Sequence, residues 1–320
     1  MLFSLFLLLF GLLVLTLGAH GLVWGAARLA LAAGLSPLVI GLTVVAFGTS
    51  APELAVSLKS GLSGHADMAV GNAVGSSIFN TLLILGGSAL VVPLAITKRL
   101  VRLDIPIMIL VSAAALGFSL DGSFSRLEST CFFTAFLAYV GLQVWLGKTE
   151  ARPQNMSKDQ AAITRPRGIG LVLAAVAVLA GLFCLVLGSQ FMVDGASDLA
   201  RTLGMSELVI GLTIVAVGTS LPEMATSIVA ALKGERDIAV GNVVGSNIFN
   251  ILAALGATGM IAPSGLAVSP HIARFDLPVM FVAAALCLPI CRTGAVISRL
   301  EGAFFISLYV GYTVFLIFRA

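Results

Sequence analysis

Long apolar runs follow one another along this chain and are separated by short polar breaks. Runs of about 17 to 25 apolar residues are long enough to cross a bilayer. One stretch of about 20 residues in the middle of the chain is polar and reads as a soluble linker. Ten apolar runs can be placed, near 3–32, 36–58, 67–90, 103–120, 126–147, 168–193, 205–231, 238–261, 275–291 and 299–318.

The two sides of the linker repeat each other. Residues 41–86 align with residues 211–256 without a gap, and 28 of the 46 positions are identical. This identity indicates an old duplication of a whole unit, and its period is far too long for a solenoid. The predicted domains are a first five-helix repeat (1–147, motif 41–86), a linker (148–167) and a second five-helix repeat (168–320, motif 211–256).

The odd number of helices in each repeat determines how the second repeat must enter the membrane. A second copy of a unit with an odd number of spans must enter the membrane from the opposite face, so the repeats are predicted to be inverted. Inverted repeats that meet near the membrane midplane are typical of transporters. We therefore expect an all-α integral membrane protein with ten transmembrane helices in two inverted five-helix repeats.

Composition supports a membrane protein and excludes several other classes. Of the 320 residues, 59% are hydrophobic and only 10% are charged, whereas soluble domains carry about 25% charged residues. The net charge is only +3 and no basic stripe is present, so nucleic acid is not an expected partner. The four cysteines lie in apolar runs and are expected to be small buried hydrophobes.

Basic residues indicate the orientation of the chain. With the N-terminus outside, 13 of the 18 Lys and Arg residues fall in cytoplasmic connections, as the positive-inside rule requires. The prediction is a multi-pass protein of the cell membrane with both termini outside and the linker 148–167 in the cytoplasm.

Each repeat places an acid, a proline and two hydroxyl groups inside an apolar span. The segments are "GTSAPE" at 48–53 and "GTSLPE" at 218–223. An ionised carboxylate at a helix centre costs at least ~2.5–3.5 kcal/mol on insertion scales. No lysine or arginine lies near Glu53 or Glu223 within these spans. The missing partner of each acid is therefore predicted to be a mobile cation.

Proline explains how the same spans could supply further ligands. Pro52 and Pro222 lack an N–H and disrupt the preceding turn, so helices 2 and 7 are predicted to be broken. Broken helices are tolerated at membrane depth where the freed groups line a cavity or contact protein. The main-chain oxygens near Ala46 and Ala216 thus become candidate ion ligands.

Side-chain oxygens gather near the two acids by helical spacing. Hydroxyl and amide residues recur three or four positions apart beside each acid and again on the following helix, so they share helix faces. Oxygen donors of these kinds, together with carboxylates, suit hard cations such as sodium and calcium. The candidate ligands are Glu53, Glu223, Thr49, Thr219, Ser50, Ser220, Ser76, Ser246, Asn80 and Asn250, with Ala46 and Ala216.

Other repeated polar and small residues are expected to be structural. Glycines four apart let helices approach closely, and an aspartate at the start of a helix can cap free N–H groups. We assign Gly71, Gly75, Gly241 and Gly245 to helix packing. Asp67 and Asp237 are expected to be N-caps, and Asn72 and Asn242 are expected to serve packing or capping.

Charge counting suggests how such a site would work. Two facing carboxylates are neutralised by one divalent cation or by several monovalent cations that use extra neutral oxygens. A site that holds either set, but not both, exchanges one for the other if only filled states cross between open conformations. No enzyme is expected, because the sequence contains neither an HExxH motif nor a nucleophile–base pair. No cofactor is expected, and the partners are the ions and the lipid bilayer.

The doubled motif resembles a known family. "GTSAPE…GNAVGSSIFN" and "GTSLPE…GNVVGSNIFN" resemble the paired repeats of the cation/calcium antiporter superfamily, and within it the short prokaryotic sodium/calcium exchangers. The resemblance covers nearly the whole chain. It implies sodium-driven, electrogenic calcium transport, with the two glutamates as central ligands and the Thr, Ser, Asn and Ala oxygens named above completing calcium and sodium sites. It also implies that helices 1 and 6 slide as a gating pair.

Differences within that superfamily leave alternatives open. Potassium-dependent relatives carry an aspartate where this chain has Asn250, and proton/calcium antiporters carry glutamates in the helices that here read "GNAVG" and "GNVVG". A passive cation channel is a further alternative, although inverted broken helices favour alternating access. The linker is too short for the large calcium-sensing domains of animal relatives.

Overall fold

The computed structural model describes residues 2–150, 168–203, 216–263, 265–292 and 294–319. Most of the predicted linker 148–167 and the start of the second motif, 211–215, lie outside these residues. The chain divides into two compact units. The first comprises Met1–Thr49 and Ala138–Asn242, and the second Ser50–Leu137 and Val243–Ala320. Each unit contains segments of both sequence repeats.

The structure confirms an all-α protein with several apolar spans. Among the described residues, eight helices are long and apolar enough to cross a membrane. The count rises to nine when Pro37–Thr49 and Ala51–Leu62, which meet at a bend, are taken as one span. The predicted span 205–231 is described only from residue 216 onward. The ten-helix count therefore stays a prediction.

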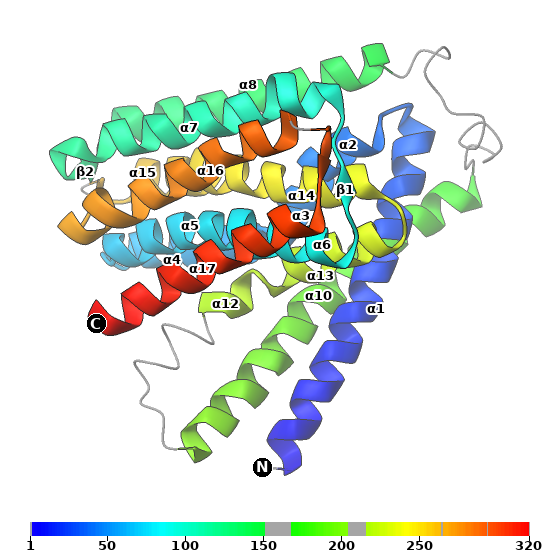
Figure 1. The fold of residues 1–320 in the computed structure, drawn as a ribbon, viewed down its shortest axis with the longest axis horizontal. Coiled ribbons are helices and arrows are strands. Elements are labelled where there is room, and N and C mark those ends of the chain that lie inside the picture. Colours follow the sequence, from blue (N-terminus) through cyan, green and yellow to red (C-terminus); the bar gives the residue numbers. More distant parts are fainter. Residues whose placement is uncertain (1, 151–167, 204–215, 264, 293, 320) are drawn as a thin grey trace. The chain divides into compact units, whose positions relative to one another are not determined.

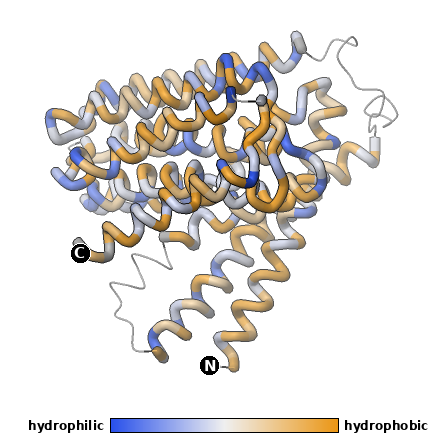
Figure 2. Tube along the Cα trace, in the orientation of Figure 1, coloured by the Kyte–Doolittle hydropathy of each residue, from blue (hydrophilic) through white to orange (hydrophobic). Residues whose placement is uncertain are grey.

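Two long helices, α1 (Leu2–Ala33) and α10 (Ile169–Thr202), lie side by side in the first unit (Figure 1). Both are hydrophobic over most of their length (Figure 2). A Cβ atom added to Gly18 would lie 2.8 Å from the main-chain oxygen of Gly181. Small residues of this kind let two membrane helices approach backbone to backbone. The glycines thus form a narrow seam between α1 and α10.

Short helices complete the first unit, together with parts of two longer helices. They are α2 (Pro37–Ile40), the π-helix η1 (Gly41–Val45), α3 (Ala46–Thr49), α12 (Ala216–Thr219), α13 (Leu221–Leu232), the end of α8 (Arg126–Glu150) and the start of α14 (Arg236–Phe249).

The second unit is a helical bundle with two short antiparallel strand pairs. Strand β1 (Leu94–Ala95) pairs with β4 (Val296–Ile297), and β2 (Ser123–Phe124) pairs with β3 (Leu266–Ala267). Each pair joins a strand of the first sequence repeat to a strand of the second. The two repeats are therefore interleaved within this unit.

The helices of the second unit follow the predicted spans closely. They are α4 (Ala51–Leu62), α5 (Ala66–Phe79), the π-helix η2 (Asn80–Ile84), α6 (Leu85–Val91), the π-helix η3 (Leu100–Asp104), α7 (Ile105–Phe118), the 3-10 helix η4 (Ser119–Asp121), the start of α8, the end of α14, the π-helix η6 (Asn250–Leu255), α15 (Gly256–Ile261), the π-helix η7 (Ile272–Asp276), α16 (Leu277–Arg292) and α17 (Arg299–Arg319).

Both broken spans restart at a serine that precedes a proline. Ser50, with φ −85° and ψ 7°, comes directly before α4, and Ser220, with φ −93° and ψ 7°, comes directly before α13. Pro52 and Pro222 lie in the first turn of these helices, where proline is tolerated because the first N–H groups of α4 and α13 have no acceptor within those helices. The breaks predicted at these turns are therefore observed.

Candidate functional site

In the first unit, Asn242 links the turn of Glu223 to the end of α3. The amide nitrogen Nδ2 of Asn242 donates to the main-chain oxygen of Glu223 at 3.3 Å and to Ser227 Oγ at 2.9 Å. Its oxygen Oδ1 lies 3.1 Å from Thr49 Oγ1 and is one of three oxygens to which that hydroxyl can donate. Glu223 and Asn242 are both fully buried. One amide side chain therefore positions two of the predicted ligands.

The second unit repeats this arrangement around Glu53. Nδ2 of Asn72 donates to the main-chain oxygen of Glu53 at 3.0 Å and to Ser57 Oγ at 3.1 Å. Glu53 is also fully buried. The prediction that Asn72 and Asn242 serve packing or capping missed this role. A signal was present, because each asparagine follows its glutamate by 19 positions in both repeats.

Oxygen atoms gather at the end of α3. The Thr49 hydroxyl lies 3.1 Å from the main-chain oxygen of Val45 and 3.4 Å from that of Ala46. It has one proton, so it can donate to only one of its three oxygen neighbours at a time. The carbonyl of Gly48 loses its helical donor, because Pro52 has no N–H. The predicted main-chain and hydroxyl ligands of this turn therefore lie close together.

The corresponding turn of the second repeat is tighter than a regular α-helix. The N–H of Ser220 donates to the main-chain oxygen of Val217, three residues back, at 3.1 Å. Pro222 has no N–H for the carbonyl of Gly218. Ala216 begins α12 and Thr219 ends it, so both lie within one turn of this break.

A π-helix begins at each of the two predicted asparagine ligands. Asn80 begins η2 and Asn250 begins η6, with 1% and 0% of their surface exposed. Within the described part of the chain, neither side chain has a hydrogen-bond partner for its oxygen or its nitrogen. Leaving a buried polar group unsatisfied costs about 1–3 kcal/mol, and π-helical turns are frequent at functional sites. Both amides are therefore suited to binding something that is not part of the protein chain.

Within the second unit, Asn250 lies on a helix that contacts helices carrying other predicted ligands. The π-helix η6 contacts both α4, which carries Glu53, and α5, which carries Ser76. Ser246 is fully buried, and its hydroxyl has no partner among the described residues. The second unit thus brings the helix that begins at Asn250 into contact with the helices that carry Glu53 and Ser76.

Asn247 is a further buried polar residue that the sequence reasoning missed. Its Nδ2 donates to Thr81 Oγ1 at 2.7 Å, while its Oδ1 has no partner in the described ranges. The signal for it was the doubled polar position, "SS" at 76–77 and "SN" at 246–247. Asn247 therefore joins the polar set of the second unit.

The two acids lie in different units, Glu223 in the first and Glu53 in the second. The single cage expected around them stays a prediction. Across the described ranges, no three His, Cys, Asp or Glu side chains gather as a metal site. A cation bound by these residues would therefore depend on hydroxyl, amide and main-chain oxygens as well as on a carboxylate.

Two structural assignments need correction. Gly75 was expected to allow close helix packing, but a Cβ added there would meet no described atom within 4 Å. Asp67 was expected to cap its helix. It lies instead in the first turn of α5, where Oδ1 accepts from the N–H of Ser269 at 2.8 Å. Its carboxylate thus connects the two sequence repeats within the second unit.

Known proteins match this chain over most of its length. The profile of the family described as "Sodium/calcium exchanger protein" matches residues 3–145 and 173–318. CaxA of Alkalimonas amylolytica is 40% identical over 269 residues, covering 83% of this chain and 84% of its own. The sodium/calcium exchanger MaX1 of Methanosarcina acetivorans is 32% identical over 312 residues, and the match covers 85% of this chain and 87% of MaX1.

A solved structure has the same fold. The sodium-calcium exchanger NCX_Mj, soaked with 10 mM Na⁺ and 10 mM Sr²⁺, matches with a TM-score of 0.85 and 30% identity, and the match covers 98% of both chains. The profile covers nearly all of this chain, and the motif glutamates are buried beside amide and hydroxyl oxygens. This chain therefore belongs to the sodium/calcium exchanger family, whose members are membrane transporters and not enzymes.

Proposed function

We propose that this transporter exchanges sodium for calcium across the cell membrane by alternating access around buried oxygen ligands. The observation that carries the proposal is the pair Asn80 and Asn250. Both amides are buried and lack partners within the described residues, and each begins a π-helix that follows the motif helix of its repeat. Mobile cations would satisfy their oxygens without any fixed ligand from the chain.

The proposed ion ligands are the residues that the doubled motif supplies. Carboxylate, hydroxyl, amide and main-chain oxygens are the donors that sodium and calcium prefer. The set comprises Glu53, Glu223, Thr49, Thr219, Ser50, Ser220, Ser76, Ser246, Asn80, Asn250 and the main-chain oxygens of Ala46 and Ala216. No resident cofactor is part of the proposal.

The number of neutral oxygens in the proposed site is the basis for proposing electrogenic exchange. Glu53 and Glu223 together supply two negative charges, which one calcium ion neutralises. The neutral oxygens around them offer places for more than two sodium ions. If more than two sodium ions replace one calcium ion, each cycle moves net charge across the membrane.

The seam between α1 and α10 suits the conformational step. A Cβ added to Gly11 or Gly18 would lie 2.8 Å from the main-chain oxygen of Gly188 or Gly181, respectively. Small residues leave few interdigitated side chains to resist a shift of one helix along the other. We propose that these two helices slide to expose the site to alternate sides.

Two features support a chain built from two related repeats, which we propose to be inverted and to contain five helices each. The family profile matches both halves of the chain separately. In sequence, β1 of the first repeat corresponds to β3 of the second, and β2 of the first corresponds to β4 of the second. The pair β1–β4 is therefore the counterpart of the pair β3–β2, as expected for two repeats related by symmetry. Placing both termini outside and the linker 148–167 in the cytoplasm agrees with the positive-inside rule.

Isotope flux in proteoliposomes tests the proposal. Calcium uptake should require an outward sodium gradient, and an equal potassium or proton gradient should not replace it. A negative interior, set with a potassium ionophore, should slow uptake if more than two sodium ions leave for each calcium ion. Uptake driven equally well by potassium or protons would contradict sodium exchange, and insensitivity to voltage would contradict electrogenicity.

A further inference from the structure

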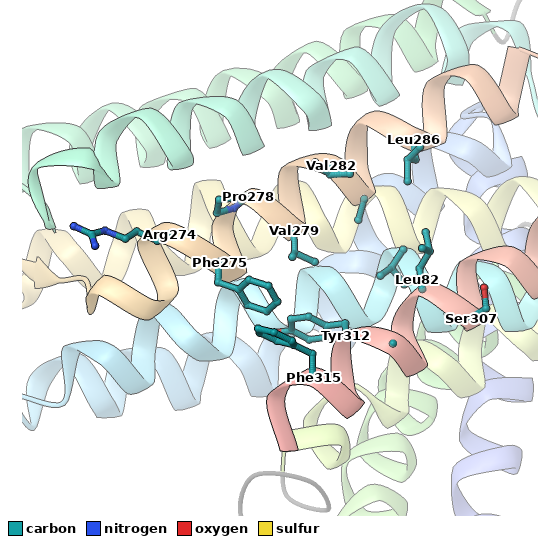
Figure 3. A pocket seen from close by; sticks show the side chains of 13 residues that line it. Leu82, Arg274, Phe275, Pro278, Val279, Val282, Leu286, Ser307, Tyr312 and Phe315 are labelled. Atoms are coloured by element: carbon teal, nitrogen blue, oxygen red, sulfur yellow. The ribbon is translucent and has the colours of Figure 1, made fainter. Parts of the chain in front are cut away.

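An apolar groove of about 590 Å³ lies in the second unit (Figure 3). Side chains of α16, among them Val279 and Val282, and of α17, among them Phe315, form its walls. Val282 is 52% exposed and Phe315 is 43% exposed. Both helices are candidate membrane spans, so bilayer hydrocarbon would cover this exposed surface. The groove volume is within the ~300–1,000 Å³ typical of small-molecule sites.

The polar groups along the walls of the groove, apart from Arg274 at its end, are bonded within the protein. Tyr312 donates its hydroxyl to Asp276 Oδ1 at 2.9 Å, and Asp276 Oδ2 lies 3.0 Å from His271 Nδ1. The Ser307 hydroxyl donates to the main-chain oxygen of Phe304 at 2.7 Å. An occupant of the groove therefore has no hydrogen bond to make along its walls. An apolar chain would fit them.

Arg274 lies at one end of the groove (Figure 3). Its side chain is exposed, and it forms no ion pair or hydrogen bond with the part of the chain that the structure describes. It comes two residues after the start of the candidate span at Ile272, which puts it near the level of lipid headgroups. A guanidinium matches a phosphate with two parallel hydrogen bonds. The nearby carboxylate of Asp276 is already engaged by His271 and Tyr312.

The length of the groove agrees with a lipid tail. Its wall runs along α16 from Pro278 to Leu286, roughly 12 Å at 1.5 Å per helical residue. One leaflet contributes half of the ~30 Å hydrocarbon core. We propose that the groove binds one anionic glycerophospholipid, with an acyl chain between α16 and α17 and its phosphate on Arg274.

Native mass spectrometry of the full-length protein in mild detergent tests this proposal. Phosphatidylglycerol and the zwitterionic phosphatidylcholine are titrated against the wild type, Arg274→Gln and Val279→Trp, which fills the groove. Lys59→Gln is the matched control, because Lys59 is an exposed basic residue of the same unit that does not line the groove. A melting curve for each variant verifies that it is folded.

We expect one tightly held phosphatidylglycerol on the wild type and on Lys59→Gln. Arg274→Gln should bind it about tenfold more weakly, as expected for a lost charged hydrogen bond. Val279→Trp should weaken both lipids, because it removes space for the acyl chain. Wild-type lipid binding by folded Arg274→Gln or Val279→Trp would overturn the proposal, as would equal weakening by Lys59→Gln. A change of oligomeric mass in Val279→Trp with unchanged lipid binding would identify the groove as a subunit interface instead.

Discussion

The side-chain amide of Asn72 donates to the main-chain oxygen of Glu53 at 3.0 Å. Asn242 forms the equivalent bond to Glu223 in the other unit. In each repeat, therefore, an asparagine holds the backbone of the turn that carries the glutamate. Asn242 additionally contacts Thr49 and is fully buried, whereas Asn72 is half-buried.

We predict that Asn242→Ala impairs the protein more than Asn72→Ala. Each change leaves a buried carbonyl and a serine hydroxyl without their donor, at about 1–3 kcal/mol per unsatisfied group, but only Asn242→Ala also removes a contact of Thr49. Melting temperature and calcium uptake of the two variants measure this. An equal loss in both variants would contradict the role assigned to the Asn242–Thr49 contact.

Glu53→Gln and Glu223→Gln should each reduce sodium-driven calcium uptake to background while the protein stays folded. Glutamine keeps the shape but removes the charge that the transported ions neutralise. Uptake in proteoliposomes and a melting curve are the two measurements. Asp194→Asn is the matched control, since Asp194 is an exposed acid on α10. Sodium-driven uptake that survives in either glutamine variant would refute the ligand assignment.

Gly18→Ala should destabilise the protein, whereas Gly21→Ala should not. A Cβ at Gly18 would lie 2.8 Å from the main-chain oxygen of Gly181, while one at Gly21 would lie 3.4 Å from that of Ala177, close to an ordinary contact. Both changes favour helix formation by up to about 1 kcal/mol. A difference in melting temperature between the two variants therefore reports the contact with α10. Melting temperatures in detergent compare the two. A lower melting temperature for Gly21→Ala than for Gly18→Ala would be inconsistent with the glycine seam.

Asn250→Asp should make transport depend on pH. The new carboxyl is neutral when protonated, like the asparagine, and adds a third negative charge when it loses its proton. That charge should hold cations more tightly and slow their release. Calcium uptake from pH 5.5 to 8.5 should therefore fall with rising pH in the variant, relative to the wild type at each pH. A constant ratio between the two proteins would argue against Asn250 as a ligand.

Glu235, in the turn between α13 and α14, should make the stability of the folded protein depend on pH. Burial raises the pKa of its carboxyl above 4.5, and Asp237 raises it further, while Lys233 opposes the shift. The folded state thus favours the protonated form, so ionising this carboxyl destabilises it as pH rises. Glu235→Gln should match the wild type near pH 4 and melt higher at pH 7 to 8. A stabilisation that was equally large at pH 4 would exclude this cause.

The sequence predicted those parts of the fold that have local signals. Apolar run length located the spans, and Pro52 and Pro222 located the breaks, because proline acts on the turn that contains it. Buried acids and neighbouring oxygen residues identified the candidate ligands, since a carboxylate inside an apolar span is costly unless it has a function.

Other features have no local signal of that kind. A π-helix such as the one that begins at Asn80 has no distinctive side-chain spacing. The strands β1 to β4 each contain two residues, too few for the alternation by which strands are recognised. The partner of Asn72 depends on which helices pack together, which the order of residues alone does not state.

The strand pairs β1–β4 and β2–β3 each need one member from either half of the chain. A half-length ancestor would have carried only the counterparts of β1 and β2, which belong to different pairs. It could have completed both ribbons only by associating with a second copy of itself. The present gene would then be a fused homodimer, and halves expressed as two polypeptides should still recognise each other through these edges.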